Sequence, residues 1–257
     1  MDRVQDRQAF RLTYIGHATV ALDLAGERVL TDPVLRDRVA LLRRVPPSPP
    51  SPLPVSVAVV SHLHPDHCDL PSLRALGQIP IVVPAGAAAF LHSRGLRRLV
   101  ELAPGESAAV GNVVVTATPA RHDGRRMRFG GPEAAAVGYV VSAAGRRVYF
   151  AGDTDLFEGM HALGPLDVAL LPVWGWGPTL GAGHLTPETA AEAVARLRPR
   201  LAVPMHWGTF AMVGLGRRTT SRPAHRFVEA VARCAVPSRA LLLPPGGSTA
   251  LDTPLGG

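Results

Sequence analysis

The sequence predicts an α/β protein in which two packed layers of strands carry helices on their outer faces. Short, strand-like apolar runs alternate with helix signals along the chain. At 257 residues with 47% hydrophobic content, the chain can bury one sizeable core. Several apolar runs lead directly into polar clusters, as strands of α/β sheets lead into functional loops. We therefore expect a single domain over residues 1–257, and we find no internal repeat.

The first elements along the chain are strands. Residues 11–24 and 28–30 are predicted as strands joined by a turn at 25–27, and the apolar run 55–60 as a buried strand. The proline-rich segment 46–54 excludes a helix or a central strand, because proline has no N–H to donate. A domain linker is the alternative, but too little sequence precedes it to form a domain. We expect a stiff surface loop beside the active site.

Helices and strands alternate through the rest of the chain. Short helices are predicted at 71–76 and 87–94, and strands at 113–116, 137–141 and 146–150. Thr186-Pro187-Glu188 predicts a helix start, with Thr as N-cap, Pro at the first position and Glu near the positive end of the dipole. That helix is expected to end near Leu197. A last helix at 223–234 precedes a final strand at 240–243.

One short stretch, His62-Leu63-His64-Pro65-Asp66-His67, places three imidazoles and a carboxylate within six positions. Imidazole nitrogen and carboxylate oxygen are ligands that divalent transition metals, above all zinc, accept. The stretch follows the predicted strand 55–60, which would give the cluster a rigid support. A loop that is rich in histidine by chance is the alternative. With only ten histidines in the chain, we favour a metal site.

Further metal ligands are expected at His122, Asp153 and His206. Each follows a short apolar, strand-like run and begins a loop rich in Gly or Thr. Strand ends that gather at one rim of a sheet are where open α/β proteins place their chemistry. For Asp153 the alternative is a turn or N-cap residue, because Gly152-Asp153-Thr154-Asp155 also suits a turn.

Taken in order, these residues resemble the ligand pattern of the metallo-β-lactamase superfamily. Three further motifs resemble a branch that includes the ascorbate-6-phosphate lactonases and the phospholipase D enzymes that hydrolyse N-acyl phosphatidylethanolamine: Gly16-His17-Ala18-Thr19, Thr31-Asp32-Pro33 and Met205-His206-Trp207-Gly208-Thr209-Phe210. The resemblance covers residues 10–247 and implies an αββα sandwich, with two mixed sheets and helices on the outer faces. It says less about substrate, because this fold hosts many reactions.

The resemblance also implies seven ligands for two divalent metal ions, zinc above all, with manganese as the alternative. They are His62, His64 and His122 for one ion, Asp66, His67 and His206 for the other, and Asp153 between the two. In an extended segment the side chains of His62 and His64 point the same way and can bind one ion. Asp153 is the distant ligand able to span two cations, because a carboxylate has two oxygens.

Other residues are expected around the metals. His184 precedes a predicted helix N-terminus, where an anion is favoured, and related enzymes carry a histidine at this position near the metal site. We predict that it contacts the substrate oxyanion or a phosphate, with a loop-ordering hydrogen bond as the alternative. Asp32 is expected to orient a ligand histidine through its free ring N–H. His17 is expected to be structural or to lie behind the ligands. Trp174 and Trp176 either line the pocket or pack.

Composition limits location and partners. No apolar leader and no apolar run of about 20 residues is present, so neither a signal peptide nor membrane insertion is expected. Cys68 and Cys234 do not make a disulfide framework and fit a reducing compartment, the cytoplasm. The net charge of +7 suggests an anionic partner. However, all 27 basic residues are arginines, scattered without the aromatic residues that stack bases, so nucleic acid is not expected.

The function expected from these residues is that of a metal-dependent hydrolase acting on a small, anionic substrate, with Arg125 and Arg126 near its charge. A bound cation lowers the pKa of water, to about 7 for zinc, so a hydroxide held by the binuclear site could cleave an ester, lactone or phosphodiester bond. Asp66 would orient this nucleophile and pass a proton to the leaving group. No Ser or Cys nucleophile is needed.

Two alternatives within the superfamily remain. An RNA-processing nuclease would explain the basic pI, but such enzymes normally carry an RNA-gripping insertion, and none is evident. A single-iron sulfur dioxygenase shares the His-x-His-x-Asp-His core, and the branch motifs disfavour it. Metal analysis separates the hydrolase from the dioxygenase. The hydrolase should contain two zinc or manganese ions per chain, and the dioxygenase one iron. The sequence does not indicate the oligomeric state.

Overall fold

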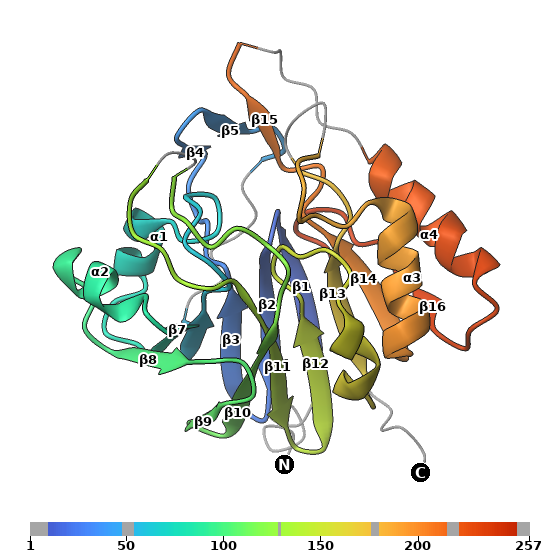
Figure 1. Cartoon of the computed structure of the whole chain (residues 1–257), viewed down its shortest axis with the longest axis horizontal. Helices are drawn as coiled ribbons and strands as arrows, with labels where there is room; N and C mark the ends of the chain where they lie inside the picture. The colour runs from blue at the N-terminus through green and yellow to red at the C-terminus, as the bar shows by residue number, and fades with distance from the viewer. Residues whose placement is uncertain (1–9, 48–53, 128–129, 176–179, 215–220, 251–257) are drawn as a thin grey trace, which may run out of the picture.

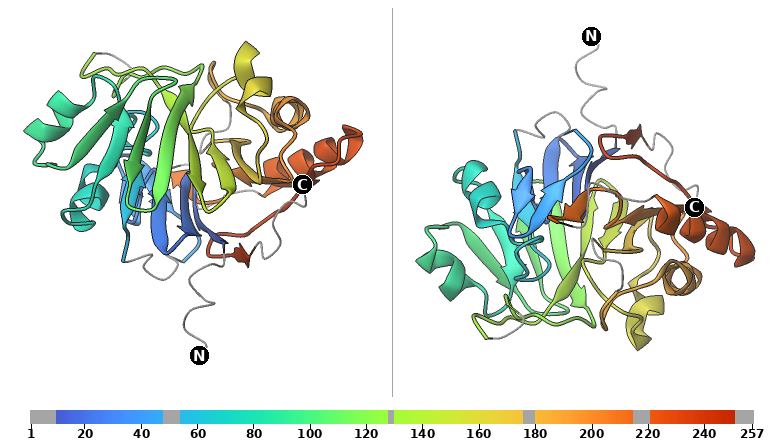
Figure 2. Two further views of the ribbon diagram at one scale, coloured as in Figure 1. Left: turned by 90° about the horizontal axis from the view of Figure 1, so that it is seen from below. Right: turned by 90° about the horizontal axis from the view of Figure 1, so that it is seen from above.

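The computed structural model describes residues 10–47, 54–127, 130–175, 180–214 and 221–250. Within these ranges, two seven-stranded sheets lie face to face (Figures 1 and 2). The first sheet contains, in spatial order, β17 (Ser248–Ala250), β1 (Arg11–Gly16), β2 (Thr19–Leu24), β3 (Glu27–Thr31), β6 (Val57–Val59), β7 (Ile81–Pro84) and β8 (Leu99–Leu102). The second contains β16 (Arg239–Ala240), β14 (Leu201–Met205), β13 (Val168–Pro172), β12 (Arg146–Phe150), β11 (Val137–Ala143), β10 (Val113–Pro119) and β9 (Ser107–Val110).

Helices cover the outer faces of both sheets. On one side lie α1 (Leu70–Ala75) and α2 (Ala88–Ser93), and on the other α3 (Pro187–Leu197) and α4 (Arg222–Arg233) (Figure 1). A 3₁₀ helix, η1 (Glu158–Leu163), packs against α3. The αββα sandwich that the sequence predicts is therefore confirmed. Within the described ranges, each helix falls short of the length and apolarity that a bilayer-spanning segment requires.

Both sheets are mixed, as expected. In the first, β1, β2 and β3 are antiparallel, whereas β3, β6, β7 and β8 run parallel. In the second, β9 to β12 are antiparallel, whereas β12, β13, β14 and β16 run parallel. Strands β6, β13 and β14 are buried at every residue, because each is covered by the opposite sheet on one face and by helices or loops on the other. This explains their continuous apolar sequences.

A small third sheet lies beside the sandwich, at the top of Figure 1. It contains β15 (Phe210–Met212), β5 (Leu42–Arg44) and β4 (Arg38–Val39). A separate apolar cluster of Val34, Val39, Leu42 and Phe210 packs beneath it. None of these strands was predicted, because two or three residues give too short a pattern.

Several predicted strands differ in extent from those of the structure, and two of the differences have a clear physical reason. The segment 11–24 is a hairpin, because Gly16 (φ 129°) and His17 (φ 59°) reverse the chain between β1 and β2. The strand predicted at 240–243 corresponds to β16, which ends at Ala240, and the later strand β17 was not predicted. The next donor along the neighbouring β14 would be the N–H of Pro204, which proline lacks, so the ladder stops there. Most of the predicted loop 46–54 lies outside the described residues.

The start of α3 agrees with the sequence prediction and allows a stability test. Thr186 Oγ1 accepts a hydrogen bond from the Thr189 N–H (3.2 Å), and Thr189 Oγ1 accepts one from the Thr186 N–H (2.8 Å). We expect Thr186→Ala to cost about 1 kcal/mol of unfolding free energy. In a chain of this size, that lowers the melting temperature by roughly 2–4 °C. Thr186→Ser keeps the acceptor and serves as the control in thermal unfolding. An equal loss in both variants would show that the cap does not stabilise α3.

Candidate metal centre

The structure brings all seven predicted metal ligands together. They lie in loops that follow β6, β10, β12 and β14, at the carboxyl ends of these strands: His62, His64, Asp66, His67, His122, Asp153 and His206. Two groups form, which we call the first and second trio. The first trio is His62, His64 and His122, and the second is Asp66, His67 and His206. Donor atoms within each trio lie within 4.8 Å of one another. The first trio forms a group of its own and the second forms one together with His17, so each contains three of the ligands that the resemblance implies.

The first trio has the spacing of a metal-binding set. His64 Nδ1 lies 2.9 Å from His62 Nε2 and 3.2 Å from His122 Nε2. Neighbouring nitrogens around a tetrahedral zinc lie about 3.4 Å apart, given a Zn–N distance of about 2.1 Å. His122 Nδ1 donates to the carbonyl oxygen of Gly183 (2.9 Å). Its Nε2 therefore carries a lone pair, which faces His64.

The second trio shows the same arrangement. His67 Nδ1 donates to Asp32 (2.6 Å) and His206 Nδ1 donates to the carbonyl oxygen of Trp174 (2.7 Å). In the neutral rings, both Nε2 atoms then carry lone pairs, and these atoms face each other at 3.0 Å. Asp153 Oδ2 lies 3.2 Å from the Nε2 of His67 and 3.3 Å from that of His206. Two lone pairs and a carboxylate repel one another unless a positive charge, a proton or a metal ion, lies among them.

Asp153 lies between the two trios. Its Oδ2 contacts the second trio, and its donor atom also lies within 4.8 Å of those of His122 and His184. Its Oδ1 is buried and has no hydrogen-bond partner within the described part of the chain. Such an oxygen costs free energy unless something binds it. The donor set and this free oxygen together fit two divalent cations.

Burial sets the protonation of most of the histidines. It lowers the pKa of His62 well below its ordinary value, that of His64 to about 4 and that of His206 to about 3. Burial also lowers the pKa of His122. These rings are consequently neutral at pH 7, which is the form that binds metal ions.

The charges of Asp66, Asp153 and His67 influence one another's pKa values. Burial acts to raise the pKa of Asp66 and Asp153, but the neighbouring imidazoles outweigh it and hold both values well below the ordinary range. Burial acts to lower the pKa of His67, but Asp153 and Asp66 outweigh it and raise the value well above normal. In the metal-free chain the His67 ring therefore carries a proton on both nitrogens, and a bound cation would displace the one on Nε2.

Asp32 is fully buried and makes the expected contact with a histidine of the cluster. Besides the His67 ring, its carboxylate accepts hydrogen bonds from the N–H (2.7 Å) and the hydroxyl (2.6 Å) of Ser61. Having donated to Asp32, the Ser61 hydroxyl accepts a bond from His62 Nδ1 (2.9 Å). One carboxylate thus orients a histidine in each trio. The sequence analysis did not predict that Ser61 links Asp32 to His62, although Ser61 directly precedes His62.

Replacing Asp32 by alanine should weaken both stability and metal binding. The change leaves buried donors on Ser61 and His67 without an acceptor, at about 1–3 kcal/mol for each unsatisfied group. Metal affinity should fall by about 10- to 100-fold, as is usual when a hydrogen-bond partner of a ligand is removed. Urea unfolding with chelator and a zinc titration would measure the two effects. Metal affinity unchanged in Asp32→Ala would contradict the orienting role.

His184 makes the loop-ordering contacts that were the alternative hypothesis for it, and it also lies beside the metal centre. Its Nδ1 lies 3.1 Å from the carbonyl oxygens of Gly181 and Ala182, so it orders its own loop. Its Nε2 lies 3.4 Å from Asp153 Oδ2, beside the metal centre. Burial acts to lower its pKa, but the contact with Asp153 outweighs this and raises the value. A substrate contact stays a prediction.

The metal centre opens into a cavity of about 590 Å³. Its walls combine polar donors of the cluster with apolar and basic side chains, among them Leu41, Arg126, Met127 and Leu180. Arg126 donates through one nitrogen to the carbonyl oxygens of Leu63 (2.9 Å) and Cys68 (3.2 Å), and these bonds fix its guanidinium beside the loop that carries His64 and Asp66. Arg125 instead pairs with Asp123 on the surface. Only one arginine of the predicted pair therefore lines the cavity.

Three candidates remain, namely the two tryptophans and Cys68. Trp174 packs against the core and is not among the described residues that line the cavity, which favours the packing alternative for it. Trp176 lies outside the described residues. Cys68 is buried, and burial raises the pKa of its thiol to about 12, which makes it a poor nucleophile.

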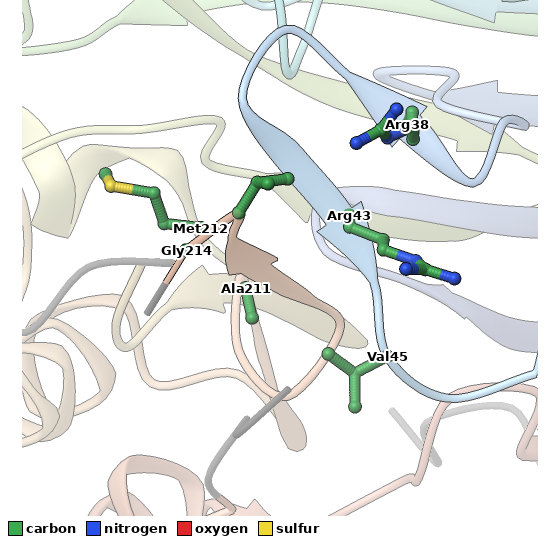
Figure 3. Close-up of a pocket in the computed structure, with 7 residues that line it drawn as sticks. Arg38, Arg43, Val45, Ala211, Met212 and Gly214 are labelled. Carbon is green, nitrogen blue, oxygen red and sulfur yellow. The ribbon is translucent and has the colours of Figure 1, made fainter. Parts of the chain in front are cut away.

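A second hollow, of about 250 Å³, lies on the small third sheet (Figure 3). The residues that line it within the described ranges are Arg38, Arg43, Val45, Ala211, Met212, Val213 and Gly214. None of them offers a carboxylate, imidazole, thiol or hydroxyl group. Of these two cavities, the first is therefore the one whose lining offers donors suited to metal-assisted chemistry.

Two facing mixed sheets, helices on both outer faces and a histidine–aspartate cluster at the strand ends define the metallo-β-lactamase fold. Residues 27–207 match the family described as beta-lactamase superfamily domain. The chain belongs to the metallo-β-lactamase superfamily, as the resemblance predicted.

Named relatives agree with the expected class. A UPF0173 metal-dependent hydrolase of Opitutus terrae is 34% identical, over 90% of this chain and 96% of its own length. N-acyl-phosphatidylethanolamine-hydrolyzing phospholipase D 1 of Caenorhabditis elegans is 33% identical, over 78% of this chain and 64% of its own. An uncharacterized protein of Mycobacterium tuberculosis is 35% identical over 80% of this chain, and the match spans 61% of that longer protein. The predicted class, a metal-dependent hydrolase, agrees with the first two names.

Solved structures agree on the fold. Igni18, a metallo hydrolase of Ignicoccus hospitalis, superposes with a TM-score of 0.72 over 96% of this chain and 100% of its own, at 24% identity. An isothiocyanate hydrolase from Delia radicum gut bacteria gives a TM-score of 0.71 over 94% of this chain and 99% of its own, at 21% identity. At such identities the likeness concerns the fold alone.

Proposed function

We propose that this protein is a hydrolase with two divalent cations, zinc above all, that cleaves an ester, lactone or phosphodiester bond in a small anionic substrate. The observation that carries the proposal is the arrangement of the two trios on either side of Asp153, beside a cavity of about 590 Å³. A substrate of ordinary metabolite size fits a cavity of this volume.

Each trio would hold one cation, and Asp153 would contribute to both. When bound, the cations would lower the pKa of a coordinated water towards about 7 and stabilise the negative charge that develops on the substrate. Four ligand histidines are neutral and the carboxylates are ionised, as such binding needs, whereas His67 would lose a proton to the solvent when a cation binds. Orientation of the ligand rings would come from Asp32, Gly183 and Trp174.

The residues around the cluster suggest three further roles. Asp66 lines the cavity, where its carboxylate would orient the attacking water and carry a proton to the leaving group. His184 also lines the cavity, where its imidazole would contact a developing oxyanion. Arg126 would attract an anionic group of the substrate, because its guanidinium is fixed at the cavity wall.

A panel of chromogenic esters, lactones and bis-aryl phosphodiesters tests the proposal. The metal-free chain, prepared with a chelator, would be assayed alone and with added zinc, manganese or iron. We expect metal-dependent turnover of at least one class with zinc or manganese. The name of the Caenorhabditis elegans relative, a phospholipase D, makes the phosphodiesters a necessary part of the panel. Absence of metal-dependent turnover with every class would overturn the proposal, and oxidation of a persulfide with one iron would favour the dioxygenase.

A further inference from the structure

His17 is not among the seven predicted ligands, yet its ring lies inside the second trio. Its side chain is buried, with 2% exposure, and its Nε2 lies 3.1 Å from Asp66 Oδ2. The ring stands 3.9 Å from that of His206, measured between centroids. The donor atoms of His17 and of the trio all lie within 4.8 Å of one another. A buried imidazole at this position needs a role.

The backbone of His17 is fixed in a conformation that non-glycine residues rarely adopt. Its φ of 59° lies in the left-handed region, where such strain is typical of functional sites. Its N–H donates to Thr209 Oγ1 (2.7 Å), and its carbonyl oxygen accepts from the N–H of His206 (2.7 Å). The preceding Gly16 permits this approach, because a Cβ there would lie 2.9 Å from the Thr209 side chain. The loop of His206 thus holds the ring of His17 in place.

Asp66 is the partner on which His17 acts. Its Oδ2 is closer to His17 Nε2 (3.1 Å) than to the Nε2 of His67 (3.9 Å) or of His206 (4.0 Å). A carboxylate that binds a cation is ionised and only accepts hydrogen bonds. His17 Nε2 must therefore be the donor in this contact.

We propose that His17 is a positioning residue, which donates from Nε2 to Asp66 Oδ2 and thereby fixes the Asp66 carboxylate at the His67–His206 pair. This inference rests on the proposed function, because Asp66 needs a fixed position only if it binds a cation and moves a proton. The Gly16-His17 motif then has a chemical reason: it delivers a hydrogen-bond donor to a ligand from the first hairpin of the fold.

Two substitutions separate the hydrogen bond from the ring packing. His17→Phe keeps a flat ring against His206 but has no donor, whereas His17→Gln places an amide nitrogen at similar reach. His17→Met, also without a donor, replaces the Phe variant if the latter does not fold. Exposed His225 on α4 gives the matched control, His225→Phe. Thermal unfolding of each metal-free variant checks that the chain is folded.

Cobalt titration of the metal-free chain provides a readout other than activity, because the ligand-field absorption follows each equivalent of Co²⁺. In His17→Phe the first equivalent should bind as in the unsubstituted chain, and the second should bind about 10- to 100-fold more weakly. His17→Gln should bind both equivalents nearly as the unsubstituted chain does. With the substrate found by the panel, kcat should fall in His17→Phe while KM stays constant, since Arg126 is untouched.

Three results would overturn the inference. These are unchanged binding of the second equivalent in His17→Phe, an equal loss in His17→Gln, or a further loss when His17→Phe is added to Asp66→Ala. The last follows because a residue that acts through Asp66 has no effect once Asp66 is gone. An unsubstituted chain that binds no cobalt would overturn the proposed function and this inference with it. Two tightly bound equivalents without turnover would count against the proposed function alone.

Discussion

Replacing Asp153 by alanine should reduce kcat/KM by on the order of 10³-fold or more, because a water without its cations regains a pKa near 15.7. The carboxylate is the group that faces the Nε2 atoms of both His67 and His206, and its donor atom also lies within 4.8 Å of that of His122. Its removal takes away the carboxylate nearest to these lone pairs and leaves Asp66, at 3.9 and 4.0 Å from them, as the negative charge of the second trio. Steady-state assays and metal analysis of the same preparation would measure both effects.

Asp153→Asn is the informative partner of this variant. It keeps the volume and one carbonyl oxygen but loses the charge, so it should retain at most one tightly bound cation. Because Asp153 is buried, unfolding curves must accompany both variants. Full activity and two bound ions in Asp153→Ala would contradict a bridging position for this carboxylate.

Replacing Asp66 by alanine should abolish measurable turnover, with a loss of about 10²- to 10⁴-fold expected for general acid–base catalysis alone. Loss of the ligand should also weaken the cation of the second trio. The first trio does not involve Asp66, so one cation should still bind. Paired measurements of kcat and of metal content would separate these two effects.

Exposed Glu229 on α4 provides a carboxylate control for this experiment. Glu229→Ala should keep the activity and metal content of the unsubstituted chain, because it lies outside the cluster and the cavity lining. If Asp66→Ala keeps full activity, the role assigned to Asp66 is wrong, whatever the other ligands do.

Local patterns predicted much of the site. His62, His64, Asp66 and His67 follow one apolar strand within six positions, so their proximity follows from chain connectivity alone. The helix α3 was predicted from its Thr-Pro-Glu start for the same reason. Strand-like runs before His122, Asp153 and His206 placed these residues at strand ends, and the sheet order brings those ends together. The order of the motifs along the chain therefore indicated which distant residues join the cluster, which no local pattern could show.

Contacts between distant segments account for what was missed. The turn at His17 depends on hydrogen bonds to Thr209 and His206, nearly two hundred positions away, so Gly16 was the one local signal for it. Arg125 and Arg126 are neighbours in sequence, yet only the second reaches the cavity, because Asp123 captures the first. Sequence alone could not choose between pocket and packing for Trp174, because its contact with the core also depends on distant segments.

Metal stoichiometry, measured on one preparation together with turnover, tests the proposed binuclear centre most directly. The chain would be stripped with chelator, equilibrated with zinc, freed of excess metal and analysed by mass spectrometry of the elements. We expect two zinc ions per chain, loss of turnover on stripping and recovery on reloading. A chain that binds no zinc, or that hydrolyses the substrate equally well after the metal is removed, would contradict the proposed binuclear centre.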